Sequence, residues 1–136
     1  MKETNYSDLI NQTFNFPQEG FHTVDNELFF NDIPLMEIIK QYGTPLKISY
    51  LPKISQQIQK AKRLFNVAMA KTDYKSKYFY CYCTKSSHFS FVLDEVLKND
   101  VHIETSSAFD IPILKEQFKK KTLSKDTHII DRKSVV

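Results

Sequence analysis

Two stretches of the chain place side chains capable of chemistry directly after apolar runs. In the first stretch, YFYCYCTKSSHF, Lys85 follows a run of aromatic residues and cysteines that is typical of a strand. Because side chains alternate along a strand, Lys85 is expected to share a face with Cys83 and Cys81. An amine on such a face is partly desolvated, which raises its neutral fraction, and a neutral amine attacks carbonyl groups. The setting therefore suits a Schiff base, unless Lys85 is only the first solvated residue after the strand.

The second stretch, HIETSSAFD, places a carboxylate at the end of the next predicted strand. In parallel α/β folds, ligands bind beyond the carboxyl ends of the strands, so Glu104 could reach the same mouth as Lys85. Ser107 and Asp110 stand three apart, as in a capping box with aspartate in place of glutamate. The simpler alternative is that these two residues only start a helix. The four histidines show no metal-ligand spacing, so no metal site is predicted.

Hydrophobic periodicity predicts the elements that would position these residues. A long amphipathic helix, Lys53–Ala70, carries apolar residues at spacings of three and four. After it we expect strands over Tyr78–Thr84, Val101–Thr105 and Thr127–Ile130, and helices over Phe89–Lys98 and from Ser106 or Ser107 to about Lys119. This alternation implies parallel strands joined by right-handed crossovers. The pattern alone fits either a β/α barrel or a doubly wound sheet.

The first part of the chain is more polar and less regular. Residues 1–33 indicate an irregular leader with one short strand, Glu27–Phe30. The segment Ile33–Ile39 is expected to start a short helix, with Pro34 in its first turn, and Gly43 is expected to end it. A further strand is predicted over Leu46–Tyr50.

Composition excludes several classes of protein. The chain has 136 residues, of which 41% are hydrophobic and 26% charged, as is ordinary for a globular domain. The net charge of +3 is small and the basic residues are scattered, so no nucleic-acid partner is predicted. We find no secretory signal and no membrane span, which predicts a cytoplasmic protein. With only two glycines, the chain has no glycine-rich phosphate loop. Cys81 and Cys83, neighbours on one strand face, are poorly placed to form a disulfide.

Taken together, these motifs resemble the start of the fold-type III pyridoxal-phosphate decarboxylases. The segment YGTPL, from Tyr42 to Leu46, is similar to the family's opening before a strand. The segment YCTK, which ends at Lys85, is similar to the end of its first barrel strand. Ile103–Asp110 resembles the Leu-Glu-x-x-Ser-x-x-Glu motif that is typical of the biosynthetic arginine decarboxylases. The resemblance covers roughly residues 20–130.

The resemblance implies a fold, a cofactor and a reaction. The fold is α/β, the opening β/α units of a parallel (β/α)8 barrel of the TIM type, truncated and preceded by a short leader. Lys85 would bind pyridoxal 5'-phosphate, Glu104 would orient Lys85 by a charge-assisted hydrogen bond, and Ser107 and Asp110 would complete the cofactor-binding set. The reaction would convert arginine to agmatine and carbon dioxide, for polyamine biosynthesis, with the cofactor ring as electron sink. The parent enzyme would be a homodimer or a larger homo-oligomer.

The resemblance also predicts how the chain is divided into segments. We expect a leader with a short helix over residues 1–45, the first part of the cofactor-binding barrel over 46–130, and an artefactual tail over 131–136. With one choice of codons, the six tail residues and a stop codon spell GATCGGAAGAGCGTCGTGTAG, which matches a common sequencing adapter. A complete barrel takes about 250 residues. We therefore expect an N-terminal fragment that is inactive by itself.

Three other interpretations remain open. The parent could be a diaminopimelate decarboxylase or another amino-acid decarboxylase, because the residues that contact substrate would lie downstream. It could also be a non-catalytic barrel that binds pyridoxal phosphate as a carrier or regulator. Taken as written, the chain could instead be a small α/β interaction module whose open strand edges need a partner.

Overall fold

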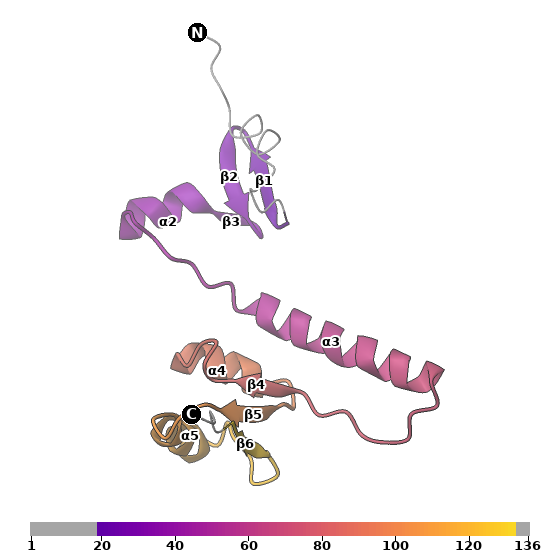
Figure 1. The fold of residues 1–136 in the computed structure, drawn as a ribbon. Helices are drawn as coiled ribbons and strands as arrows, with labels where there is room; N and C mark the ends of the chain where they lie inside the picture. Colours follow the sequence, from indigo (N-terminus) through magenta and orange to yellow (C-terminus); the bar gives the residue numbers. More distant parts are fainter. Residues whose placement is uncertain (1–18, 133–136) are drawn as a thin grey trace. The chain divides into compact units, whose positions relative to one another are not determined.

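The computed structural model describes residues 19–132, and Figure 1 shows their helices and strands. Contacts divide the chain into two compact units, Met1–Ile48 and Ser49–Val136. The boundary predicted after residue 45 lies just before the observed one. The two units are described separately below.

The first unit is an antiparallel sheet with one helix beside it. Strands β1 (Phe21–Val24), β2 (Glu27–Phe30) and β3 (Ile33–Pro34) pair in that order. Helix α2 (Leu35–Tyr42) follows β3 and contacts β2. The helix ends as predicted at Gly43, whose φ of 78° lies in the left-handed region that glycine adopts at low cost.

Two tight turns fold much of the leader that we expect to be irregular into hairpins, so this expectation is wrong for β1. Ile33 and Pro34 form β3 rather than the first turn of the helix, which begins at Leu35. Asp25 and Asn26 form the first turn with φ of 48° and 62°, and Asn31 and Asp32 form the second with φ of 47° and 63°. Two-residue hairpins of this type require positive φ at both positions, and short polar side chains tolerate it. Of the three strands, the sequence analysis predicts only Glu27–Phe30.

The predicted strand Leu46–Tyr50 is not formed. Leu46 and Ile48 are exposed, and no described strand pairs with this segment. A strand is stable only when its backbone groups find partners, so β-forming residues alone do not produce one here. The segment instead carries the chain from the first unit into the second.

The second unit is built on a parallel sheet of three strands. Strands β4 (Cys81–Cys83), β5 (His102–Thr105) and β6 (Ile129–Asp131) are neighbours in that order. Both pairings are parallel, which confirms the direction predicted from the helix–strand alternation. Strand β6 includes Asp131, and the Arg132 N–H donates to the Thr105 carbonyl oxygen at 2.9 Å. Asp131, the first residue of the predicted tail, therefore belongs to β6, Arg132 bonds to the neighbouring strand, and residues 133–136 lie outside the described residues.

Three helices accompany this sheet, close to the predicted bounds. They are α3 (Pro52–Lys71), α4 (Ser90–Leu97) and α5 (Asp110–Lys119), visible in Figure 1. Helix α5 begins only at Asp110, and this late start is the one that Pro112 predicts. Pro112 lies in the first turn, where its missing N–H costs no hydrogen bond.

The buried core lies between these helices and one face of the sheet. One cluster joins α3 and α4, and a second joins β5 to α5 and the loop after it. Tyr82 and Leu97 pack against both clusters. The clusters consist of Ile58, Val92, Val96 and Val101, and of Ile103, Leu114 and Leu123.

Polar contacts attach the first half of α3 to the end of α4. Asn99 is buried, donates from Nδ2 to Ser55 Oγ at 2.8 Å, and accepts from Gln59 Nε2 at 3.1 Å. Lys62 Nζ donates to the carbonyl oxygens of Asn99 and Asp100 at 3.0 and 2.8 Å. These bonds fix α3 against the α4–β5 loop and so position the sheet.

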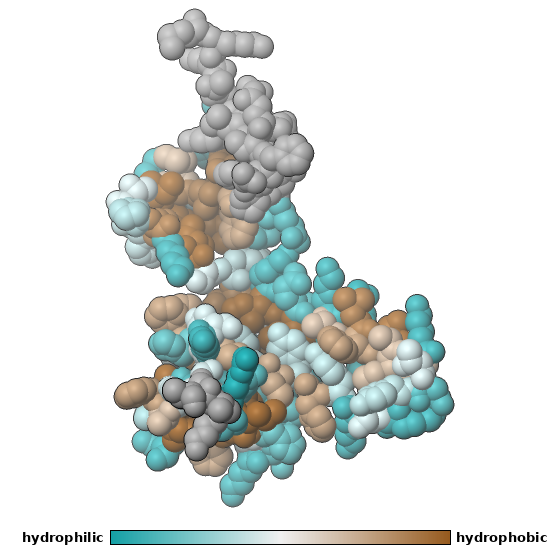
Figure 2. All heavy atoms as spheres, viewed as in Figure 1, coloured by the Kyte–Doolittle hydropathy of each residue, from teal (hydrophilic) through white to brown (hydrophobic). Residues whose placement is uncertain are grey.

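The opposite face of the sheet carries side chains of a different kind. The register places Cys81 beside His102, Cys83 beside Glu104, and Glu104 beside Ile130. Because side chains alternate, these residues point away from the core, and Ile130 keeps 48% of its surface exposed. Figure 2 shows hydrophobic residues, in brown, reaching the surface elsewhere as well. Among the described residues, the helices therefore pack on one face of this sheet, and its second face is accessible.

Candidate functional site

Lys85 lies in the tight turn that follows β4, at the carboxyl end of the sheet. Strand β4 ends at Cys83, and the Ser86 N–H donates to the Cys83 carbonyl oxygen at 3.1 Å. Lys85 is exposed, and its side chain forms no hydrogen bond or ion pair with any residue that the structure describes. The prediction of a partly desolvated amine on the face of Cys83 is therefore wrong, because strand alternation stops where the turn begins.

Glu104 lies on the middle strand, with its carboxylate on the face away from the core. Its carbonyl oxygen accepts from the Thr84 N–H at 3.0 Å and from the Thr84 hydroxyl at 3.2 Å, which ties β5 to the end of β4. Its side chain is 24% exposed, and Arg132 Nη1 lies 3.8 Å from Oε1. That buried Oε1 has no hydrogen-bond partner among the described residues. A buried carboxylate oxygen without a donor is costly, so Glu104 has spare capacity for a cationic donor.

Asp110 holds the loop between β5 and α5. It is 8% exposed, and its Oδ2 accepts from the backbone N–H of Ser106 at 2.9 Å and of Ser107 at 3.1 Å. Burial alone would raise the pKa of Asp110, but hydrogen bonding from Ser106, Thr84 and Ser107, together with the nearby His88, outweighs it and lowers the pKa. Asp110 thus stays ionised and acts as one half of a capping box.

The other half of that capping box is absent, because no side chain caps the first turn of α5. Ser107 is exposed and contributes its N–H and its carbonyl oxygen, which accepts from the Asp110 N–H at 3.1 Å. The contacts of Ser107 and Asp110 are those of residues that start a helix, which is the simpler of the two predicted roles.

The four candidate residues lie along the carboxyl ends of two adjacent strands, and the structure does not bring all of them together. Asp110 contacts Ser107, and Glu104 contacts Thr84, the residue that precedes Lys85. Among the described residues, Lys85 and Glu104 share no hydrogen bond or ion pair. Their types nevertheless suit pyridoxal phosphate: Lys85 offers an accessible amine for the carbonyl carbon, and Glu104 Oε1 offers an acceptor for a cationic nitrogen.

Two features of this region are missed by the sequence analysis. Thr84 is fully buried and bridges the end of β4 to both Glu104 and Asp110. At the opposite end of the sheet, His102 Nδ1 accepts from the His128 N–H at 3.0 Å, and burial, then His128, lowers the pKa of His102. The sequence could have predicted this pair, because His102 and His128 each come just before the isoleucines that pair between the parallel strands β5 and β6.

The cysteines on the accessible face are free thiols, as predicted. Burial raises the pKa of Cys81, and the carboxylate of Glu104 raises it further. Cys83 Sγ lies 3.7 Å from Ser106 Oγ, so this thiol is also held in place. Both thiols extend the face that carries Glu104 with small, weakly polar side chains.

No protein family, curated protein or solved structure matches this chain. Within residues 19–132, no helix combines the length and the apolar character that a membrane span requires. Among the same residues, no group of three or more histidine, cysteine, aspartate or glutamate side chains could hold a metal ion.

Proposed function

We propose that this chain is the N-terminal part of a pyridoxal-phosphate-dependent amino-acid decarboxylase, most similar to arginine decarboxylase. The observation that carries the proposal is the pair of adjacent parallel strands β4 and β5. The first is followed by an accessible lysine, and the second bears a carboxylate whose buried Oε1 has no hydrogen-bond partner among the described residues. Both lie at the carboxyl end of the sheet, where parallel α/β folds bind their ligands.

The sheet as a whole supports the barrel that this function needs. Its strands run in sequential order, and among the described residues the helices and the buried core lie on one face. The second face carries cysteines, histidines, Glu104 and a half-exposed isoleucine, and no described helix covers it, whereas a doubly wound sheet has helices on both faces. We therefore favour the wall of a β/α barrel over a doubly wound sheet.

The roles of the residues follow from their positions. When bound, pyridoxal phosphate supplies the electron sink for the carbanion that remains after loss of carbon dioxide. The Lys85 amine would hold the cofactor through its carbonyl carbon, for which the amine must be accessible and neutral. Glu104 Oε1 would accept a hydrogen bond from a cationic nitrogen of the bound group and orient it. Asp110 keeps the β5–α5 loop against the end of β4.

The proposal also covers the whole enzyme. We place it in the cytoplasm, as a homodimer or larger homo-oligomer that acts on arginine, and we expect no activity from the 136-residue chain alone. The residues that stack on the cofactor ring, bind its phosphate and select the substrate would come from further β/α units.

The first test is to read the source nucleic acid across the codon for Ile130. We expect the frame to continue for several hundred codons and to encode an Asn-Gly segment and a glycine-rich loop. In the protein encoded by that frame, borohydride reduction after addition of pyridoxal phosphate should label Lys85 stoichiometrically, and Lys85→Ala should abolish both the label and agmatine formation from arginine.

Other results would redirect the proposal. Labelling of Lys85 without release of carbon dioxide from any amino acid would favour the non-catalytic barrel. Release of carbon dioxide from diaminopimelate but not from arginine would change the substrate. Labelling spread evenly over surface lysines, such as Lys98 and Lys125, would show that Lys85 is not the cofactor residue and would refute the proposal.

A further inference from the structure

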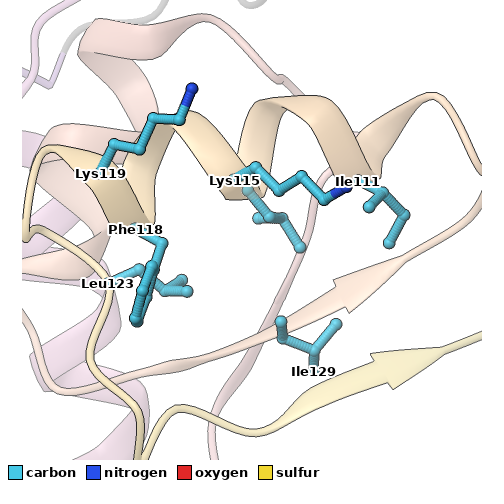
Figure 3. Close-up of a pocket in the computed structure, with 7 residues that line it drawn as sticks. Ile111, Lys115, Phe118, Lys119, Leu123 and Ile129 are labelled. Carbon is cyan, nitrogen blue, oxygen red and sulfur yellow. The ribbon is translucent and has the colours of Figure 1, made fainter.

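An apolar groove lies beside α5, and none of the four candidate site residues lines it. It has a volume of about 430 Å³ and lies between α5, the loop after it and β6. Its lining consists of Ile111, Leu114, Lys115, Phe118, Lys119, Leu123 and Ile129. In Figure 3, Phe118 and Leu123 lie together at one end of the groove, Ile111 lies toward the other, and Ile129 faces them from β6.

The groove requires an occupant because large apolar side chains line it while remaining half exposed. Ile111, Phe118 and Ile129 keep 40%, 45% and 47% of their surface in solvent. On α5, the lining positions 111, 114, 115 and 118 follow the spacing of one helix face. This stripe shares Leu114 with the core, so it is the margin of the core-facing side of α5, and the described residues leave its other apolar members half exposed.

The position of the groove in the fold indicates what fills it. Right-handed crossovers place α4 and α5 on the same face of the sheet, where the two helices contact each other. The groove lies on the side of α5 toward β6, which is the next place in that layer of helices. A helix that follows β6 in a right-handed β/α unit would arrive there.

The charged residues at the groove indicate which kind of helix would fit it. Lys115 and Lys119 stand one turn apart along its length, with apolar stems that line it. The amino group of Lys119 points away from the apolar side chains in Figure 3. A helix that lies in the groove would therefore meet two positive charges beside its apolar stripe, and carboxylates flanking that stripe would complement them.

We propose that this groove binds the helix of the β/α unit that β6 begins, an amphipathic helix whose apolar stripe is flanked by glutamate or aspartate. The inference rests on the barrel in the proposed function, but it uses none of the residues assigned to the cofactor. The ridges of such a helix would fill the space between α5 and β6, as in ordinary helix packing.

The test uses the 136-residue chain and two designed, fluorescein-labelled helical peptides. Both peptides carry leucines at helical spacing, and one has glutamates beside the stripe where the other has lysines. We expect fluorescence anisotropy to show that the glutamate peptide binds about tenfold more tightly than the lysine peptide. Phe118→Ser should weaken that binding about tenfold, whereas Phe109→Ser, at a phenylalanine that is 86% exposed and outside the groove, should not.

Charge reversal provides a second variant that leaves the apolar lining intact. The double substitution Lys115→Glu and Lys119→Glu should reverse the preference toward the lysine peptide, while Lys125→Glu, in the following loop, should leave it unchanged. Equal binding of the two peptides, no binding of either, or binding that survives Phe118→Ser would overturn the proposal. So would self-association of the chain in sedimentation velocity that Phe118→Ser abolishes, because a second copy would then occupy the groove.

The outcome is separable from that of the proposed function. Lys85→Ala should bind the glutamate peptide as tightly as the unmodified chain does. If Lys85 is not labelled but the peptide still binds, the cofactor proposal fails and the groove proposal holds. If Lys85 is labelled specifically but the peptide does not bind, only the groove proposal fails.

Discussion

Replacing Asp110 by alanine tests whether this carboxylate organises the carboxyl end of the sheet. The buried side chain accepts the N–H groups of Ser106 and Ser107 at 2.9 and 3.1 Å, and it lies beside Thr84 at the end of β4. Alanine removes the acceptor of both backbone N–H groups, so neither of them then has a side-chain partner among the described residues. The Thr84 hydroxyl keeps a partner, because it also donates to the Glu104 carbonyl oxygen.

The magnitude follows from the number of bonds and the exposure of the loop. A hydrogen bond to a charged group contributes about 1.5–3 kcal/mol, and two are lost. Ser107 is exposed, so water can replace the carboxylate at its amide, whereas the amide of the half-buried Ser106 is less easily solvated. We expect Asp110→Ala to lower the free energy of unfolding by about 3 kcal/mol.

Urea denaturation followed by circular dichroism at 222 nm measures this loss, and hydrogen exchange locates it. The amides of Ser106 and Ser107 should lose protection in Asp110→Ala, while those of β1 and β2 in the first unit should not. Asp126→Ala, at an exposed aspartate in the loop before β6, is the matched control and should change stability by less than about 0.5 kcal/mol. A loss below about 1 kcal/mol for Asp110→Ala, or unchanged protection of both amides, would refute the reasoning.

The charge of Asp110 adds a pH dependence with a defined sign. Its folded-state pKa is lowered, so the unfolded state binds more protons between the two pKa values. The stabilisation is therefore complete above the unfolded pKa of about 4 and is lost as the pH falls through the folded-state value. Asp110→Asn should be less stable than the unmodified chain at neutral pH, and the difference should shrink on acidification. A difference that grows below pH 4 would contradict this assignment.

Five further substitutions test the framework. Ile103→Ala, at a fully buried residue of the central strand, should cost about 3 kcal/mol in urea denaturation, whereas Ile130→Ala on the exposed face of the neighbouring strand should cost less than about 1 kcal/mol. Asn99→Ala removes the two side-chain hydrogen bonds that Asn99 makes with Ser55 and Gln59 of α3 and should cost about 2 kcal/mol, with faster exchange of the α3 amides. Asn26→Gly should be tolerated at a φ of 62°, whereas Asn26→Val should destabilise the β1–β2 hairpin by about 1–2 kcal/mol, measured by amide exchange.

The helices of the second unit could be predicted because each has a strong amphipathic period and must cover the sheet. Helix α3 was expected over Lys53–Ala70 and extends from Pro52 to Lys71. The parallel direction of the strands followed from the order of elements alone. The strands themselves are shorter than their β-forming residues suggest: Tyr78 and Phe79 precede β4 without joining the ladder. Pairing partners, which local sequence does not specify, decide where a strand begins.

The errors have physical causes of the same kind. Strand Leu46–Tyr50 was predicted from propensity and does not form, because no neighbouring strand satisfies its backbone. The β1–β2 and β2–β3 hairpins were missed because their turns use Asp-Asn and Asn-Asp rather than the more familiar pairs with glycine. The exposure of Lys85 depends on where the turn begins, and a single residue of difference moves its side chain from one face to another.

For the candidate site, residue types were easier to predict than contacts. The sequence places Lys85 and Glu104 after neighbouring strands, and the register of β4 and β5 bears out that these strands are adjacent. That Asp110 binds two backbone amides next to Thr84 depends on the path of the β5–α5 loop, which no periodicity specifies. The cofactor role of all four candidates stays a prediction.

The sequential order of β4, β5 and β6 has a consequence for biosynthesis. Each strand pairs with the one translated just before it, so Cys81 meets His102 and Ile103 meets Ile129 without waiting for distant parts of the chain. Contacts that are close in sequence form quickly, because little loop entropy opposes them. A ribosome that makes this chain would release one β/α layer after another, each docking on an edge that is already in place. Folding during synthesis would thus proceed in the order of translation, from the amino-terminal side of the sheet.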